Sequence, residues 1–214
     1  MIQCPSCERR QEPHLICQQC GAPLAVPSDL DCFSALGFPK KLSIDLPLLE
    51  STYHDLGRKI HPDRFASASP QLRDASMRAT ALLTRSYRTL RDPVSRGLYW
   101  LEVNGDKLSE NNKNVPTELA AMVFEVQEQL VDLHDAAGDA ATELRDEIEN
   151  RRKELSSSMD ESNEQLARNF ARWDSNEGSR DELTKELKAV LSKIAYLRTL
   201  IRDVDRALEN QKAA

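Results

Sequence analysis

Apolar residues recur every three or four positions along most of this chain, from Leu46 to Leu208. That spacing places them along one side of an α-helix. Only seven glycines occur in 214 residues, which favours helix and argues against a glycine-rich phosphate-binding loop. We therefore predict an all-α protein.

Helix-start signals divide the first half of the chain. Asp45, Ser69 and Asp92 are each followed by a proline within two residues, the pattern of a capping side chain with proline in the first helical turn. Pro62 ends the helix that Asp45 begins, because proline lacks a backbone N–H and disfavours helical angles before it. Two helices joined by so short a loop are predicted to pack as an antiparallel hairpin.

The tip of this hairpin carries the sequence RKIHPDRF, residues 58–65. His61, Pro62 and Asp63 are flanked there by three cations, which are Arg58, Lys59 and Arg64. The other histidines give His61 no second metal ligand at a useful spacing, and no serine or cysteine nucleophile has a partner in sequence. We predict no catalytic residue and no enzyme activity; Asp63 could simply cap the turn.

The second half of the chain predicts an antiparallel three-helix bundle. A polar, turn-rich linker over residues 104–116 precedes it. Its first helix has a seam of Leu119, Val123, Val126, Leu130 and Leu133. Two longer apolar stripes follow, separated by a polar break at residues 174–182.

Four cysteines near the start form two C-x-x-C pairs, Cys4 with Cys7 and Cys17 with Cys20. Each pair aims two thiolates at one point, and two pairs supply the tetrahedral sulfur ligands that zinc prefers. Four sulfur ligands leave no open position, so we predict structural zinc, with iron as an alternative for the same ligands. Cys32 falls outside this spacing and is expected to be a buried thiol.

Charge is unevenly distributed along the chain. Residues 1–110 hold 14 Lys and Arg against 13 Asp and Glu, whereas residues 111–214 hold 15 against 22. The acidic half is a poor partner for nucleic acid, whose binding depends on cations facing phosphates. No apolar run of about 18 residues would span a membrane, and the start lacks the apolar core of a signal peptide. We expect a soluble protein of the bacterial cytoplasm, or of the mitochondrial matrix if eukaryotic, with the cytoplasm preferred.

Residues 31–101 resemble the J-domain of DnaJ-type co-chaperones. The resemblance rests on DCFSALG at 31–37, L-x-x-x-Y-x-x-L from Leu49, HPD at 61–63 and SYRTLRDP at 86–93. HPDRF followed by ASAS, and RGLYWL further on, look more like the HscB branch, which adds a C-terminal helical bundle. Some members of that branch carry an N-terminal pair of C-x-x-C knuckles. Gly57 departs from the family, which often places alanine or another helix former there.

The resemblance implies a function for each part. The HPD loop and the basic side of its preceding helix would dock on an ATP-bound DnaK- or HscA-type chaperone and stimulate its ATPase, using Arg58, Lys59, His61, Pro62, Asp63 and Arg64. The bundle would capture an iron–sulfur scaffold protein of the IscU type through its first helix.

For that capture face the sequence predicts an apolar pair, Met122 and Phe124, which lies off the seam beside Glu125 and Glu128. The predicted domains are a zinc module over residues 1–28, the J-domain and linker over 29–110, and the bundle over 111–214. The alternative is a general J-domain co-chaperone that presents unfolded clients.

Overall fold

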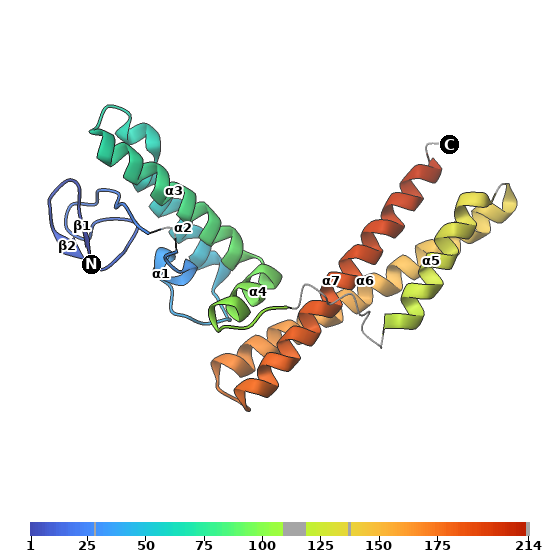
Figure 1. The fold of residues 1–214 in the computed structure, drawn as a ribbon. Coiled ribbons are helices and arrows are strands. Elements are labelled where there is room, and N and C mark those ends of the chain that lie inside the picture. Colours follow the sequence, from blue (N-terminus) through green and yellow to red (C-terminus); the bar gives the residue numbers. More distant parts are fainter. Residues whose placement is uncertain (28, 109–118, 137, 213–214) are drawn as a thin grey trace. The chain divides into compact units, whose positions relative to one another are not determined.

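The computed structural model describes residues 1–27, 29–108, 119–136 and 138–212. Its chain forms two compact units, Met1–Trp100 and Leu101–Ala214, and each is described by itself. Seven α-helices make up most of the described chain (Figure 1), which confirms the all-α prediction. The predicted boundaries at residues 28 and 110 lie outside the described residues.

The first unit begins with a small cysteine-bearing module that contains two short strands. Strand β1 (Ile2–Gln3) pairs antiparallel with β2 (Arg10–Gln11), with Ile2 opposite Gln11. Three apolar side chains that follow these strands in the sequence are buried: Leu15, Leu24 and Val26. Sequence patterns did not predict these strands, because two-residue strands are too short to show an alternating pattern.

Helix α1 (Cys32–Leu36) begins at Asp31, whose carboxylate accepts hydrogen bonds from the N–H groups of Phe33 and Ser34. It ends at Gly37, which has a left-handed φ of 73°. Phe33 is buried and meets the ring of Trp100 edge to face at 5.9 Å. These contacts fix the short helix against the rest of the unit.

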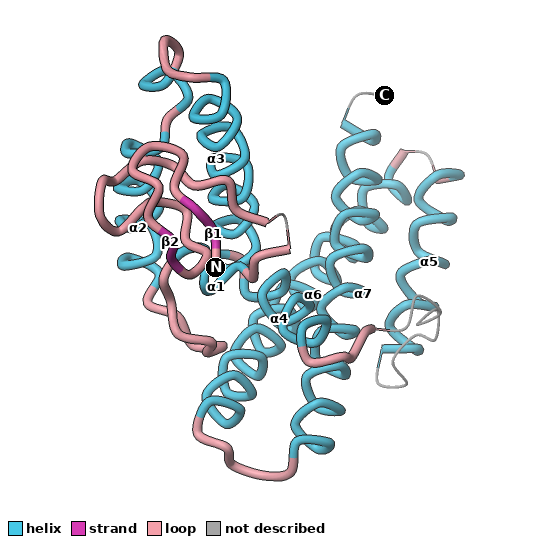
Figure 2. Tube along the Cα trace, turned by 60° about the vertical axis from the view of Figure 1, so that its left-hand side comes forward, coloured by secondary structure: helices cyan, strands magenta, loops and turns pink. Residues whose placement is uncertain are grey.

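Helices α2 (Leu46–Ile60) and α3 (Pro70–Arg91) form the predicted antiparallel hairpin (Figure 2). Asp45 and Ser69 cap them as expected. The rings of Tyr53 and Tyr87 stack between the helices, with centroids 4.1 Å apart. Leu46, the first residue of α2 and the start of its apolar stripe, is instead exposed.

Helix α4 (Pro93–Val103) follows directly after α3. Asp92 accepts a hydrogen bond from the N–H of Ser95 and so begins the helix as predicted. Trp100 and Leu101 are buried, whereas Leu98 is exposed. Only one side of this helix is therefore covered.

The second unit is an antiparallel bundle of α5 (Ala120–Asp135), α6 (Asp139–Asp174) and α7 (Arg180–Lys212). Its core confirms the predicted seam, since Leu119, Val126 and Leu133 are buried while Val123 and Leu130 pack against them. Ser179 accepts a hydrogen bond from the N–H of Glu182, as the capping pattern predicts. The long helices α6 and α7 supply most of the packing surface.

Candidate functional site

The His-Pro-Asp loop begins where α2 ends and forms the 3-10 helix η1 (Pro62–Phe65). The side chains of His61 and Asp63 are 56% and 90% exposed, so the loop presents both of them outward. The N–H of Asp63 donates to Nδ1 of His61 at 3.3 Å, and Nδ1 lies 3.6 Å from the Asp63 carboxylate. The loop therefore has a defined local geometry while remaining open to a partner.

Two hydroxyls on α3 fasten the start of this loop. Ser76 Oγ and Thr80 Oγ1 both donate to the carbonyl of Ile60, at 2.6 and 3.3 Å. That carbonyl belongs to the last turn of α2, where no N–H of the helix can reach it. The hydrogen bonds satisfy it inside the protein and fix the distance between α3 and the loop.

The three cations around the loop occupy different environments. Arg58 pairs with Asp55 at 2.5 Å, which offsets part of its charge. Arg64 donates through Nη1 to the carbonyl of Arg58 at 2.9 Å and so closes the end of α2. Lys59 is exposed on the same turn. Sequence spacing predicted the exposed cations but not the capping contact of Arg64.

The four predicted metal ligands lie together in the N-terminal module. The sulfur atoms of Cys4, Cys7, Cys17 and Cys20 all lie within 4.8 Å of one another. Cys4 and Cys20 sulfurs are 3.6 Å apart, and those of Cys7 and Cys17 are 3.7 Å apart. A tetrahedral zinc bound at about 2.3 Å would separate its sulfur ligands by about 3.8 Å. The cluster therefore fits a metal ion of this kind.

Backbone groups and neighbouring thiols shift the pKa values of two of these cysteines, Cys17 and Cys7. The backbone N–H of Cys20 is the main cause that lowers the pKa of Cys17, to about 6. At Cys7 the backbone N–H of Arg9 acts to lower the pKa, but burial and the other three thiols raise it to about 12. One thiol that ionises readily beside one that holds its proton is the expected pattern when four like groups crowd together. Cys32 is buried and lies outside the cluster, as predicted.

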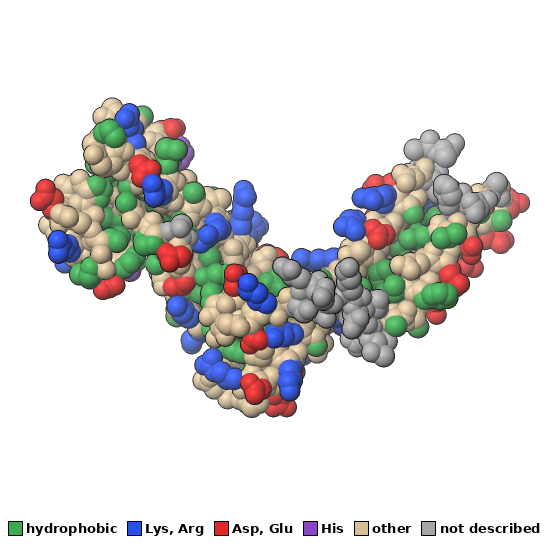
Figure 3. Space-filling model, in the orientation of Figure 1, with side chains coloured by type: hydrophobic (Ala, Val, Ile, Leu, Met, Phe, Trp, Pro, Cys, Tyr) green, Lys and Arg blue, Asp and Glu red, His purple; other side chains and the backbone are tan. Residues whose placement is uncertain are grey.

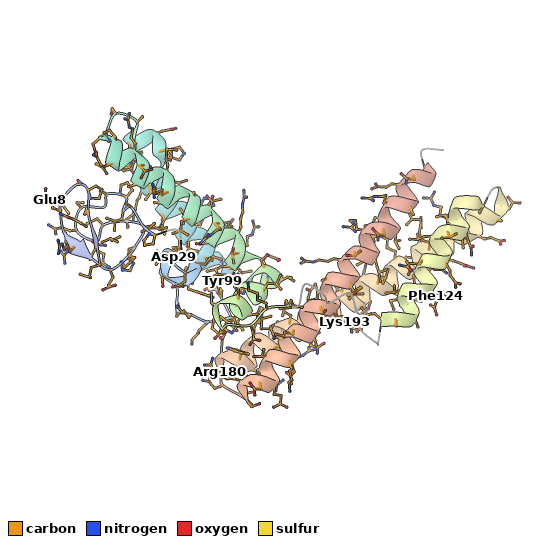
Figure 4. The ribbon with its side chains drawn as sticks, in the orientation of Figure 1. Glu8, Asp29, Tyr99, Phe124, Arg180 and Lys193 are labelled. Atoms are coloured by element: carbon orange, nitrogen blue, oxygen red, sulfur yellow. The ribbon has the colours of Figure 1, made fainter. Side chains whose placement is uncertain are left out.

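The predicted face of α5 is only partly as expected. Phe124 is 61% exposed and projects from the helix (Figure 4). Met122 corrects the prediction, because it is half-buried and packs against the bundle core. Glu125 pairs with Arg151 of α6 at 2.8 Å, whereas Glu128 is exposed.

Val131 is an exposed apolar residue that the sequence analysis missed. It is 64% exposed and lies seven residues after Phe124, which puts both on one side of α5. Figure 3 shows hydrophobic and acidic side chains intermixed over this helix. The signal was available, since Val131 also lies off the predicted seam.

Comparisons with known proteins agree with this arrangement. No family model matches the chain. A co-chaperone protein HscB homolog of Bordetella avium is 35% identical over 133 residues, covering 61% of this chain and 78% of that protein. The human iron-sulfur cluster co-chaperone protein HscB is 28% identical over 156 residues, covering 72% of this chain and 66% of its own length. An Arabidopsis thaliana homolog is 29% identical over 145 residues, 68% of this chain and 57% of its own length.

Two solved structures share the fold. Human HscB matches 95% of this chain and 96% of its own, with a TM-score of 0.65 at 24% identity. HscB from Vibrio cholerae matches 85% and 99%, with a TM-score of 0.62 at 22% identity. The class of protein that has this helical hairpin, an exposed His-Pro-Asp loop and a helical bundle is the J-domain co-chaperones. With the Bordetella relative at 35% identity, the chain belongs to the HscB co-chaperone family.

Among the residues that the structure describes, no helix is both long and apolar enough to cross a membrane.

Proposed function

We propose that this protein stimulates the ATPase of a DnaK- or HscA-type chaperone and delivers to it an iron–sulfur scaffold protein of the IscU type. The observation that carries the proposal is the exposed His61-Pro62-Asp63 loop held at the tip of the α2–α3 hairpin. Relatives of the chain are named as iron-sulfur cluster co-chaperones, which supports the choice of cargo.

The loop would make the central contact with the chaperone. Asp63 is almost fully exposed, so its carboxylate can pair with an arginine of the partner through charge-assisted hydrogen bonds. Pro62 restricts the backbone and lowers the ordering cost of docking. Arg58, Lys59 and Arg64 surround the loop and would speed its encounter with an acidic surface.

The bundle would hold the scaffold protein. Phe124 provides an exposed apolar anchor on α5, and Glu125 and Glu128 supply carboxylates beside it. Met122 would act indirectly, because it supports the helix from the core side.

The metal ion is proposed to be zinc in a structural role. A reducing compartment suits four reduced cysteines, and we place the protein in the cytoplasm.

An ATPase assay with a purified DnaK-type chaperone tests this function. Wild type should stimulate hydrolysis, and a scaffold protein should increase the effect. His61→Gln and Asp63→Asn should each abolish stimulation with unchanged melting temperature, since both side chains are largely exposed. Normal stimulation by either variant would exclude this role for the loop. In a pull-down, a broad set of unfolded clients in place of one scaffold would favour a general J-protein.

A further inference from the structure

A furrow runs along the seam between α2 and α3, starting at the His-Pro-Asp loop. Its first part is a hollow of about 540 Å³ beside His61 and Arg64, with Gly57 and Leu83 among its lining residues. A second hollow of about 470 Å³ continues toward Arg88 and Arg91. The two hollows share Tyr53 and Thr84 as lining residues. We call this combined surface the α2–α3 furrow.

Gly57 creates the room in the first hollow. It has ordinary helical geometry, and a Cβ atom placed there would meet only Leu83 Cδ2, at 3.9 Å. A glycine in a helix interior weakens the helix relative to alanine, and here neither the backbone angles nor a close neighbour requires it. The missing side chain leaves open space directly beside the loop that is proposed to dock on the chaperone.

The charges that line the furrow are mainly positive. Arg58 and Arg64 lie at the loop end, and Arg88 and Arg91 lie at the far end. Asp92 is the one carboxylate among these lining residues of the described chain. The same bias extends over α3, in which five arginines accompany a single aspartate. Such a surface attracts carboxylates.

The furrow has the length of a short extended peptide. Residues 80 to 91 of α3 follow it, and 11 steps of about 1.5 Å give a length of about 16 Å. An extended chain rises about 3.3 Å per residue, so about five residues would fill it. Thr84 lines both hollows, and its hydroxyl provides a polar partner for a peptide backbone, whereas the hydroxyl of Thr80 already donates to the carbonyl of Ile60.

We propose that the α2–α3 furrow receives an extended acidic segment of the chaperone, whose carboxylates meet Arg64 near the loop and Arg88 at the far end. The inference rests on the proposed function, because it extends the contact of the loop with the same partner. Nucleic acid is a poorer occupant, because base binding needs open aromatic faces. Tyr53 stacks on Tyr87 at 4.1 Å, and Arg91 lies over the Tyr87 ring at 5.7 Å.

Filling or discharging the furrow tests the proposal in the full-length protein. The measurement is the concentration that gives half-maximal stimulation of a DnaK-type chaperone. Gly57→Met fills the first hollow, and Arg88→Ala removes a cation from the second. Each should raise that concentration by roughly three- to tenfold, the loss of one charged or well-fitted interface contact. The Arg88→Ala effect should shrink at high salt because screening weakens the lost attraction.

Two variants control for folding and for total charge. Gly57→Ala adds one methyl group at ordinary contact distance, so it should raise the melting temperature and leave most of the hollow open. Arg78→Ala removes the same charge from the same helix, but Arg78 pairs with Asp74 and does not line the furrow. It should change the half-maximal concentration by less than about twofold.

The outcomes separate this inference from the proposed function. Failure of wild type to stimulate any DnaK-type chaperone rejects the function itself. Stimulation by wild type that Gly57→Met and Arg88→Ala leave unchanged rejects the furrow alone. An equal loss for Arg78→Ala overturns it as a general charge effect. Binding of a fluorescent oligouridylate that Arg88→Ala abolishes would assign the furrow to nucleic acid instead.

Discussion

The hydroxyl of Ser76 donates a 2.6 Å hydrogen bond to the carbonyl of Ile60, the last residue of α2 before the His-Pro-Asp loop. Both residues are fully buried, so no water can replace this contact. The bond connects the second turn of α3 to the residue immediately before the loop. It makes the position of His61 depend on the packing of the hairpin.

Ser76→Ala should therefore weaken the hairpin and loosen the loop. It removes the closer of two donors to a buried carbonyl, with Thr80 remaining at 3.3 Å. We expect a loss of about 1–2 kcal/mol in the free energy of unfolding, the usual cost of a lost buried partner. Urea unfolding followed by helical circular dichroism measures it.

Hydrogen exchange should also become faster over residues 61–66 in Ser76→Ala. Ser67→Ala is the control, because Ser67 is exposed beyond η1. It should leave the unfolding free energy within about 0.5 kcal/mol of wild type. Equal stability of Ser76→Ala and wild type would show that Thr80 satisfies the carbonyl without help.

Chelation should act on the cysteine module and spare the helices. Folding of so small a segment is coupled to metal binding, so removing the metal should unfold residues 1–27 while helical circular dichroism is nearly preserved. Cys20→Ser should reproduce this effect. Cys32→Ala should bind one metal ion normally, because Cys32 lies outside the cluster. A cooperative loss of all helical signal on chelation would show instead that the helices of the first unit depend on the metal-bound module for their stability.

Metal affinity should increase as the pH rises through the neutral range. Zinc binds thiolates, and the pKa of Cys7, raised to about 12, keeps this thiol protonated at neutral pH before metal binds. The metal must displace that proton, so acid opposes binding and alkali favours it. Below a pH of about 6 the Cys17 thiolate also gains a proton, and affinity should fall more steeply. Titration calorimetry in buffers of different ionisation enthalpy counts the released protons; binding without proton release would contradict the prediction.

Sequence reasoning located the sites through residue identity and failed where side-chain direction decides. The cysteines and the His-Pro-Asp loop depend on local spacing, and the structure brings the four sulfurs together. Met122 was misplaced because one residue in a helix turns by about 100°, so a position beside the seam can still touch the core. The furrow could not be predicted, since it depends on how closely α2 and α3 approach around Gly57.

The bundle core should tolerate truncation poorly. Leu197 is fully buried among residues from all three helices of the second unit. Leu197→Ala should lower the free energy of unfolding by about 2–5 kcal/mol, through lost burial and a residual cavity. Denaturant unfolding of the full chain measures the loss. Thr199→Ala on the exposed side of α7 is the control and should have little effect; a similar loss in both variants would argue against a cavity at Leu197.

Phe124 and Met122, two residues apart on α5, should separate binding from stability. Phe124→Ser removes an exposed ring, so the melting temperature should stay within about 2–4 °C of wild type, while affinity for an IscU-type scaffold should fall at least tenfold if the ring is an interface anchor. Met122→Ser removes a side chain that packs against the core, so its main effect should be a loss of about 1–3 kcal/mol in stability.

Val131→Ser extends the test along the side of α5 that carries Phe124, and it should weaken scaffold binding without unfolding the protein. Calorimetric titration with the scaffold, paired with a thermal melt, measures both quantities for each variant. Wild-type affinity in both Phe124→Ser and Val131→Ser would exclude this side of α5 from scaffold binding, and it would leave the His-Pro-Asp loop as the chaperone contact.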